Sequence, residues 1–332
     1  MRKISYLLFL LTLFRSGFLP AESAAVLIQL NRPDGLYVGQ HRIAVSEGTT
    51  FFLYSTGDYR LIGKFGKKGE GPREFKGRID NIRITVDSII VSSRKKVSRY
   101  SIDGGFEQEV TTSSRYGSRY TPIGNYFAGN GYAFSDKLLF QTINIYDNQL
   151  QKIKEVFRAK SPLQRGRKTK IFYAAFDFTV CSERIFITGS ENFLIDAFDK
   201  QGERLPSINR DYPRIKITNA HKQKVYEFFR TNPETKSRYE QIKQQLDFPS
   251  HFPAIRYIFS DDNSIYVHTY KKAEGKTEFF IFDGRGTFQK KALLPVFEEN
   301  PIETSPIAFH QNRIHQLVEN QNEEWELHIT PF

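Results

Sequence analysis

Four segments of this 332-residue chain share one form, in which an apolar strand ends at an aspartate and is followed by a turn and a second strand. Asp and Gly at such places allow positive φ angles and side-chain-to-backbone hydrogen bonds, which tight hairpin turns require. We therefore interpret the aspartates as turn formers rather than ligands. They are Asp103, Asp147, Asp199 and Asp283. Repeated hairpins of this kind predict an all-β fold.

The spacing of these turns indicates what the hairpins build. Successive turns lie 44, 52 and 84 residues apart along the chain. The long last interval contains the one clearly helical stretch, Asn219 to Leu246, and without its 28 residues the interval falls to 56. A period in the forties to fifties is the size of a four-stranded propeller blade. The repeat therefore predicts a β-propeller with a small helical insertion.

The helical insertion carries apolar residues at helical spacing in two runs. Thr218 or Asn219 can cap a first helix, and Pro233 suits the start of a second. Three aromatic residues of the insertion either pack on the propeller, which we favour, or dock a partner. They are Tyr226, Phe229 and Tyr239.

The two ends of the chain supply the remaining strands. Residues 51–65 form another hairpin, and residues 305–332 contain three strands that lack a fourth. Val26–Leu30 can be that fourth strand, and pairing the chain ends would remove sheet edges that invite aggregation. The fold class is thus all-β: a six-bladed β-propeller formed by residues 26–332, with the insertion 219–246 between blades four and five.

A glycine-rich run, Leu61–Phe75, has glycines at 63, 66, 69 and 71 and fits neither common phosphate-loop spacing. We read its glycines as conformational. With residues 82–91, 97–104 and 248–267, this run resembles the six-bladed propellers related to NHL repeats that are common among exported bacterial proteins. The sequence departs from that family at Ser92 and Ser93, where an acidic residue is usual.

The N-terminus has the form of an export signal. Arg2 and Lys3 precede an apolar run, Ile4 to Phe14, and small residues follow up to Ala25, near which we expect cleavage. The run is too short to span a bilayer comfortably. We therefore expect a signal peptide over residues 1–25, no stable membrane span, and a monomer that is periplasmic or secreted.

Composition narrows the partners. The only cysteine, Cys181, lies in an apolar run, so an intramolecular disulfide and a cysteine-based zinc cluster are excluded. The chain has 30 Phe and 17 Tyr, which suits β-rich packing, and a formal net charge of +11. A basic protein favours anionic partners such as acidic polysaccharide, lipid headgroups or nucleic acid, and export makes nucleic acid the weakest of these.

The basic residues cluster in loops that propeller topology places on one face. Connections between blades, and turns between the second and third strands of a blade, lie at the same end, where rigid scaffolds usually carry function. Ten cations there are our candidate ligand-binding residues, against the alternative that they are solvated charges. They are Lys67, Lys68, Arg73, Arg94, Lys95, Lys96, Arg165, Arg167, Lys168 and Lys170.

Two functions remain open. The first, which we favour, is a non-enzymatic binding scaffold for a protein, peptide or anionic glycan of the cell envelope, without cofactor or metal. The second is a metal-assisted hydrolase or lyase in the central channel, where the expected inner strands offer Asp177 but few other ligands. Those strands are Ile82–Val86, Phe176–Thr179 and Arg256–Phe259. We read His310 and His315 as strand residues, and no catalytic residue is nominated.

Overall fold

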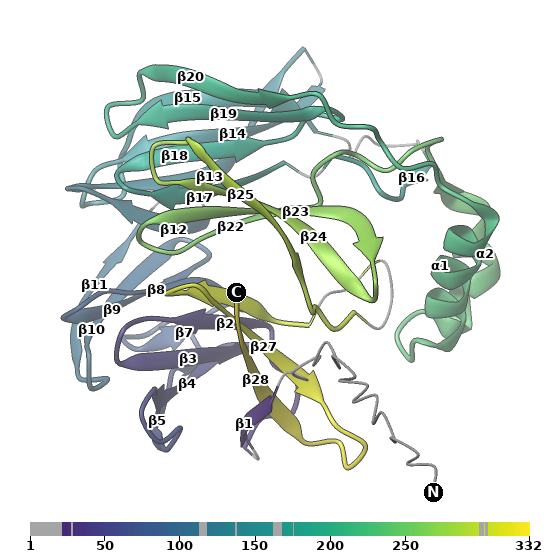
Figure 1. Ribbon diagram of the computed structural model, residues 1–332. Helices are drawn as coiled ribbons and strands as arrows, with labels where there is room; N and C mark the ends of the chain where they lie inside the picture. Colours follow the sequence, from purple (N-terminus) through teal and green to yellow (C-terminus); the bar gives the residue numbers. More distant parts are fainter. Residues whose placement is uncertain are drawn as a thin grey trace, which may run out of the picture.

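Six four-stranded antiparallel sheets make up the structure, which is a computed structural model (Figure 1). Neighbouring sheets touch through their first strands, and the sixth sheet returns to the first, so the sheets close a ring. The six-bladed β-propeller predicted from the repeat is confirmed. The structure describes residues 22–332 apart from Ile28, 113–117, Lys137, 162–167, Ala175, 299–301 and 303–304.

Each blade is a meander of four strands whose first strand faces the axis. Blade 1 contains β2 (Gly35–Val38), β3 (Arg42–Glu47), β4 (Thr50–Ser55) and β5 (Leu61–Phe65). Blade 2 contains β8 (Ile79–Ile84), β9 (Ser88–Ser93), β10 (Lys96–Ser101) and β11 (Phe106–Thr111). Blade 3 contains β12 (Ser118–Ile123), β13 (Tyr126–Ser135), β14 (Leu138–Tyr146) and β15 (Lys152–Lys160).

The second half of the ring follows the same plan. Blade 4 contains β17 (Asp177–Cys181), β18 (Arg184–Thr188), β19 (Phe193–Asp199) and β20 (Arg204–Arg210). Blade 5 contains β22 (Tyr257–Ser260), β23 (Ser264–Ala273), β24 (Lys276–Asp283) and β25 (Phe288–Leu294). Blade 6 contains β26 (Ile307–His310), β27 (Arg313–Glu319), β28 (Trp325–Pro331) and β1 (Glu22–Val26).

Blade 6 joins the two ends of the chain, because β1 pairs antiparallel with β28. Closure by the N-terminal segment is confirmed, but the strand lies earlier than the predicted Val26–Leu30. Leu27 and Leu30 are only 3% and 4% exposed and fill the core between blades 6 and 1, so their apolar pattern reflects burial in a connection rather than a strand. A cut after Ala25 would leave only Val26 of β1.

The aspartate turns explain the repeat. Oδ1 of Asp147 accepts hydrogen bonds from the backbone N–H groups of Gln149 and Gln151, at 2.9 and 2.8 Å. Asp199 and Asp283 accept the same pair of bonds from the residues two and four positions ahead. These three aspartates are turn formers, as predicted. The turn of blade 2 differs, since Oγ of Ser101 accepts from Gly105 and Asp103 pairs with Arg42 instead.

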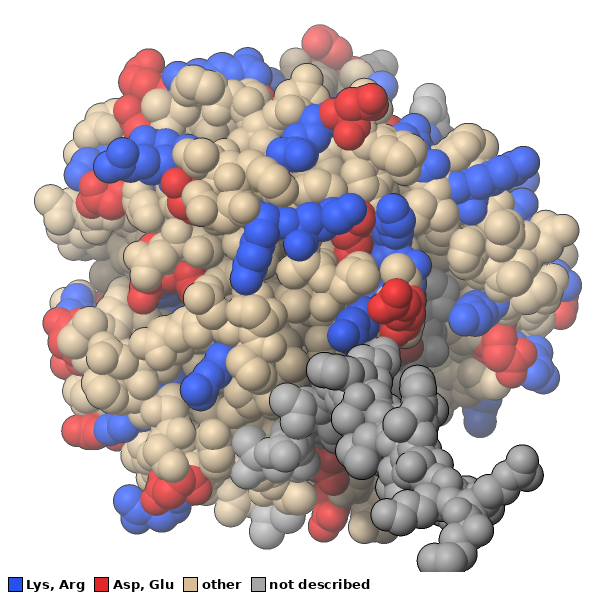
Figure 2. Space-filling model, in the orientation of Figure 1, with Lys and Arg blue, Asp and Glu red and all other residues tan. Residues whose placement is uncertain are grey.

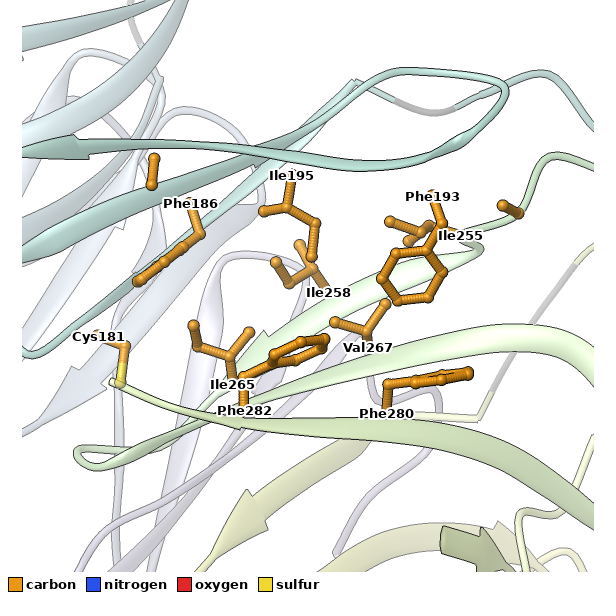
Figure 3. Packing of buried hydrophobic residues seen from close by; sticks show 12 residues of the cluster. Cys181, Phe186, Phe193, Ile195, Ile255, Ile258, Ile265, Val267, Phe280 and Phe282 are labelled. Atoms are coloured by element: carbon orange, nitrogen blue, oxygen red, sulfur yellow. The ribbon is translucent and has the colours of Figure 1, made fainter. Parts of the chain in front are cut away.

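Apolar side chains between neighbouring blades form the core. In the contact between blades 4 and 5, Phe186 and Ile195 point towards Phe282 and their neighbours from the next blade (Figure 3). Cys181 lies at one end of this cluster and is 1% exposed, and burial raises the pKa of its thiol to about 11. The prediction that Cys181 is a core residue is confirmed.

The helical insertion lies between blades 4 and 5, as predicted. It contains α1 (Asn219–Thr231), a 3-10 turn (Lys236–Arg238), α2 (Tyr239–Gln245) and the short strand β21 (Leu246–Asp247), which pairs with β16 (Thr169–Lys170). Thr218 caps α1, as expected, but Pro233 lies in the loop before the 3-10 turn and does not begin the second helix.

The insertion packs on the propeller. Val225 is fully buried in a cluster with Phe172 and Phe252, and Phe229 packs against the same cluster. The ring of Tyr226 lies 5.6 Å from that of Phe248. Phe229 and Tyr226 therefore pack as favoured. In the described part of the chain, no helix is both long and apolar enough to cross a membrane.

Candidate binding face and central channel

One end of the ring carries the connections between blades and the turns between second and third strands, and we call it the loop-rich face. Helices α1 and α2 belong to one of these connections and mark that face at the right of Figure 1. The opposite face carries the tighter turns that begin at residues such as Asp147 and Asp283. Loops on a rigid scaffold are where binding sites usually lie.

The glycine-rich run Leu61–Phe75 is an architectural element of the loop-rich face. Within it, β6 (Lys67–Lys68) pairs in parallel with β7 (Glu74–Phe75). Gly66 has a φ of +80°, and a Cβ there would lie 2.7 Å from the carbonyl oxygen of Thr49, so only glycine fits. Phe75 is completely buried between blades 1 and 2. The run anchors one blade to the next, as its glycines indicated.

Two of the ten candidate cations already form ion pairs with carboxylates of the same chain. Nζ of Lys96 donates to the carbonyl oxygens of Gly71 and Glu74, each at 2.9 Å, and lies 2.8 Å from a carboxylate oxygen of Glu109. Lys96 is only 8% exposed, so it holds the glycine-rich run rather than facing a partner. Lys67 pairs with Glu74 at 3.0 Å.

The remaining candidates fall into two groups separated by blade 3. Lys68, Arg94 and Lys95 lie near blades 1 and 2, and Lys168 and Lys170 lie in the connection from blade 3 to blade 4. All five are exposed and make no ion pair with a described residue. The guanidinium of Arg73 lies over the ring of Phe106. Arg165 and Arg167 lie outside the described residues.

On one side of the molecule, positive and negative residues are mixed rather than gathered into a single patch. Figure 2 shows the side of the ring with the insertion at its right, where Lys and Arg alternate with Asp and Glu. Some surface cations are paired with carboxylates, as Lys154 is with Glu203 and Lys272 with Glu298.

A cavity of about 620 Å³ lies beside the second group of cations, between blades 3 and 4 and the insertion. We call it the blade 3–4 groove. Lysine side chains line it, and Glu191 on its wall is bound to Arg214 at 2.6 Å. Its polar and aromatic lining residues are Gln141, Lys160, Ser161, Lys168, Lys170, Tyr173, Phe176, Glu191 and Asp247.

Exposed aromatic residues lie beside the groove. Tyr173 on its wall is 36% exposed, and Tyr132 and Phe134 on the long β13–β14 hairpin are 40% and 64% exposed. Sequence reasoning found Lys168 and Lys170 from their charge but missed these aromatics and Gln141. The β13–β14 extension was hidden because blade 3 has few turn residues in its sequence.

The central channel is a second cavity, of about 450 Å³, lined by the first strands of all six blades. Asp177 begins β17, an inner strand, as predicted, but its carboxylate is bound by Arg119, which also donates to the carbonyl of Phe178 at 2.8 Å. At the other end, Arg83 of blade 2 reaches Asp262 of blade 5 at 2.5 Å. Burial raises the pKa of Asp80, near the start of β8.

The channel brings together few metal-ligand side chains. Among the residues the structure describes, no three His, Cys, Asp or Glu side chains are grouped so that they could hold a metal ion. His310 and His315 lie on β26 and β27 and are strand residues, as expected. Burial lowers the pKa of both, that of His315 to about 4.

Comparison with known proteins gives similar folds but no family. No family model matches the chain, and no curated protein matches its sequence. It is similar to a protein of unknown function from Bacteroides caccae (9% identity, 79% of this chain and 81% of the other, TM-score 0.43). It is also similar to a DUF4221 family member from Bacteroides vulgatus (9% identity, 92% and 94%, TM-score 0.46).

The WD40 domain of Neurospora crassa Pan2 is a third similar structure, with 9% identity over 89% of this chain and 78% of that domain, and a TM-score of 0.42. The assignment of six blades rests on the sheet topology of the chain itself.

Proposed function

We propose that this protein is an exported propeller of the NHL-related kind that acts as a non-enzymatic binding scaffold. Its partner is an anionic component of the cell envelope, and the loop-rich face is the binding surface. The observation that carries the proposal is the set of exposed, unpaired cations on this face: Lys68, Arg94, Lys95, Lys168 and Lys170.

Physical chemistry supports this role. Exposed cations that are already paired gain little from a new anion, whereas unpaired ones keep their full attraction. The net charge is +11 for the whole chain and stays positive once the expected signal with Arg2, Lys3 and Arg15 is removed, so it adds a long-range attraction that speeds encounters with anionic surfaces at low salt. The propeller supplies a rigid frame for its loops, and the export signal expected at the N-terminus would bring the protein to the envelope.

Charge reversal on opposite faces tests the proposal. One double variant, Lys168→Glu with Lys170→Glu, and another, Lys68→Glu with Lys95→Glu, change the loop-rich face. The control, Arg285→Glu with Arg313→Glu, reverses two exposed cations in turns of the opposite face. We expect at least one loop-face variant to lose retention on envelope fractions, while the control is retained like the wild type. Equal retention of all four proteins would refute the proposal.

A further inference from the structure

We propose that the blade 3–4 groove binds an acidic sugar unit of a glycan, whose neighbouring units lie along the β13–β14 hairpin. The inference rests on the proposed function, because it names the class of partner for one part of the loop-rich face. Three features of the groove converge on this ligand: its cations, a buried acceptor without a partner, and its exposed aromatic rings.

The cations select an acidic group. Lys160, Lys168 and Lys170 all line the groove, and all three are exposed and make no ion pair with a described residue. Of the two acidic residues on the wall, Glu191 is neutralised by Arg214. The groove thus has an excess of positive charge, and a carboxylate or sulfate entering it would form charge-assisted hydrogen bonds with the ammonium groups.

A buried acceptor selects a ligand with hydroxyl groups. Oε1 of Gln141 is buried and has no hydrogen-bond partner among the described residues. A buried acceptor left unpaired is unfavourable, so a ligand donor that reaches it gains a hydrogen bond that the described protein groups do not supply. Asp247, exposed on the same wall, is a second acceptor. Sugar hydroxyls are donors that suit both, whereas an acyl chain would leave both unpaired.

Aromatic rings continue the site beyond the groove. Tyr132 is paired with Gln141 across the β13–β14 ladder, so the two side chains lie on the same side of the sheet. Phe134, two residues further along the strand, lies on that side as well. Burial raises the pKa of Tyr173, and the phenol of Tyr132 raises it further. Exposed rings such as those of Tyr132 and Tyr173 offer flat apolar faces to sugar rings.

An acidic peptide is the main competitor for this site, since it would also satisfy the lysines. It lacks the ring of hydroxyl donors that Gln141 and Asp247 would accept from, and it does not offer flat faces to the exposed aromatic rings. Binding of a glycan should therefore depend on Tyr173 and Gln141, whereas binding of an acidic peptide should not. An experiment can separate the two partners on this basis.

The test is calorimetric titration of the full mature protein with defined oligomers. The acidic probes are hexagalacturonate and a heparin-derived hexasaccharide; maltohexaose tests charge, and hexaglutamate tests the sugar. Tyr173→Ala is compared with Tyr126→Ala, because both tyrosines are 36% exposed and Tyr126 lies at the other end of blade 3. Gln141→Met removes the acceptor and keeps the size of the side chain.

We expect at least one acidic oligosaccharide to bind, and maltohexaose and hexaglutamate to bind at least tenfold more weakly. Tyr173→Ala and the double variant Lys168→Gln with Lys170→Gln should each weaken binding about tenfold, and Gln141→Met several-fold. Tyr126→Ala should bind within twofold of the wild type. The inference is overturned if neither acidic oligosaccharide binds, if hexaglutamate binds equally well, or if the two tyrosine variants behave alike.

The two proposals fail in different ways. If retention on envelope fractions is lost only when Lys68 and Lys95 are reversed, the proposed function stands and the glycan site in the groove is wrong. If neither pair of reversals changes retention, the proposed function itself fails.

Discussion

Replacing each of two adjacent lysines in one turn, Lys95 and Lys96, should change stability by very different amounts. Lys95 is exposed, whereas the side chain of Lys96 is 11% exposed and binds two carbonyl oxygens and Glu109, whose side chain is 15% exposed. Replacing Lys96 with Met keeps most of the apolar stem and removes only the ammonium group. Any loss of stability therefore measures what that group holds.

The expected loss follows from three broken interactions. A hydrogen bond from a charged donor contributes about 1.5–3 kcal/mol, and breaking one partner out of a buried ion pair costs about 3–5 kcal/mol. These terms overlap, because the same ammonium makes all of them, so we expect Lys96→Met to lower the free energy of unfolding by about 3–5 kcal/mol. Lys95→Met, at an exposed position in the same turn, should change it by less than about 0.5 kcal/mol.

Urea unfolding followed by circular dichroism measures both variants. Adding Glu109→Gln to Lys96→Met removes the stranded carboxylate and should recover at least about 1 kcal/mol, because the two residues are coupled. The reasoning is refuted if Lys96→Met costs less than about 1 kcal/mol, or if the second substitution adds to the loss instead of reducing it.

Three further outcomes follow from buried residues and from ring closure. Burial lowers the pKa of His268 and of His315 to about 4, so the unfolded state is protonated first as the pH falls. The free energy of unfolding should therefore fall by about 3 kcal/mol per histidine between pH 6.5 and 4, and urea unfolding that is independent of pH would contradict this. Phe75→Ala should cost about 3–5 kcal/mol in the same assay, since the ring is fully buried between two blades, and a loss below about 1 kcal/mol would show that the run does not anchor them. Mass spectrometry of the exported protein should find β1 intact from Glu22. A chain that begins at Val26 should melt at a lower temperature, because β28 loses its partner strand. Equal melting temperatures would contradict the role of β1 in closing the ring.

The fold was predictable from sequence because its signals are local. An aspartate that accepts hydrogen bonds from the second and fourth residues ahead, as Asp199 does, leaves a visible turn motif. The helical insertion was equally clear from its period and from the cap at Thr218. The closing strand was misplaced because Leu27 and Leu30 are buried without being in a strand, and burial alone produces the same apolar pattern.

The binding face was only partly predictable. Charge identifies lysines but not their surroundings, so Lys96, which is buried and internally bound, could not be told from Lys95. The groove depends on contacts between residues far apart in sequence, such as Gln141 and Tyr173, and no local pattern marks them. Arg119, which neutralises Asp177 in the channel, was missed for the same reason.

Hydrogen–deuterium exchange of the mature protein, free and bound to envelope fractions, tests the central claim most directly because it locates the face that binds. We expect slower exchange on binding in the loop-rich face, at residues 66–78, 94–95 and 168–174, with no change in the opposite turns around Asp147, Asp199 and Asp283. Protection confined to those opposite turns would contradict the account.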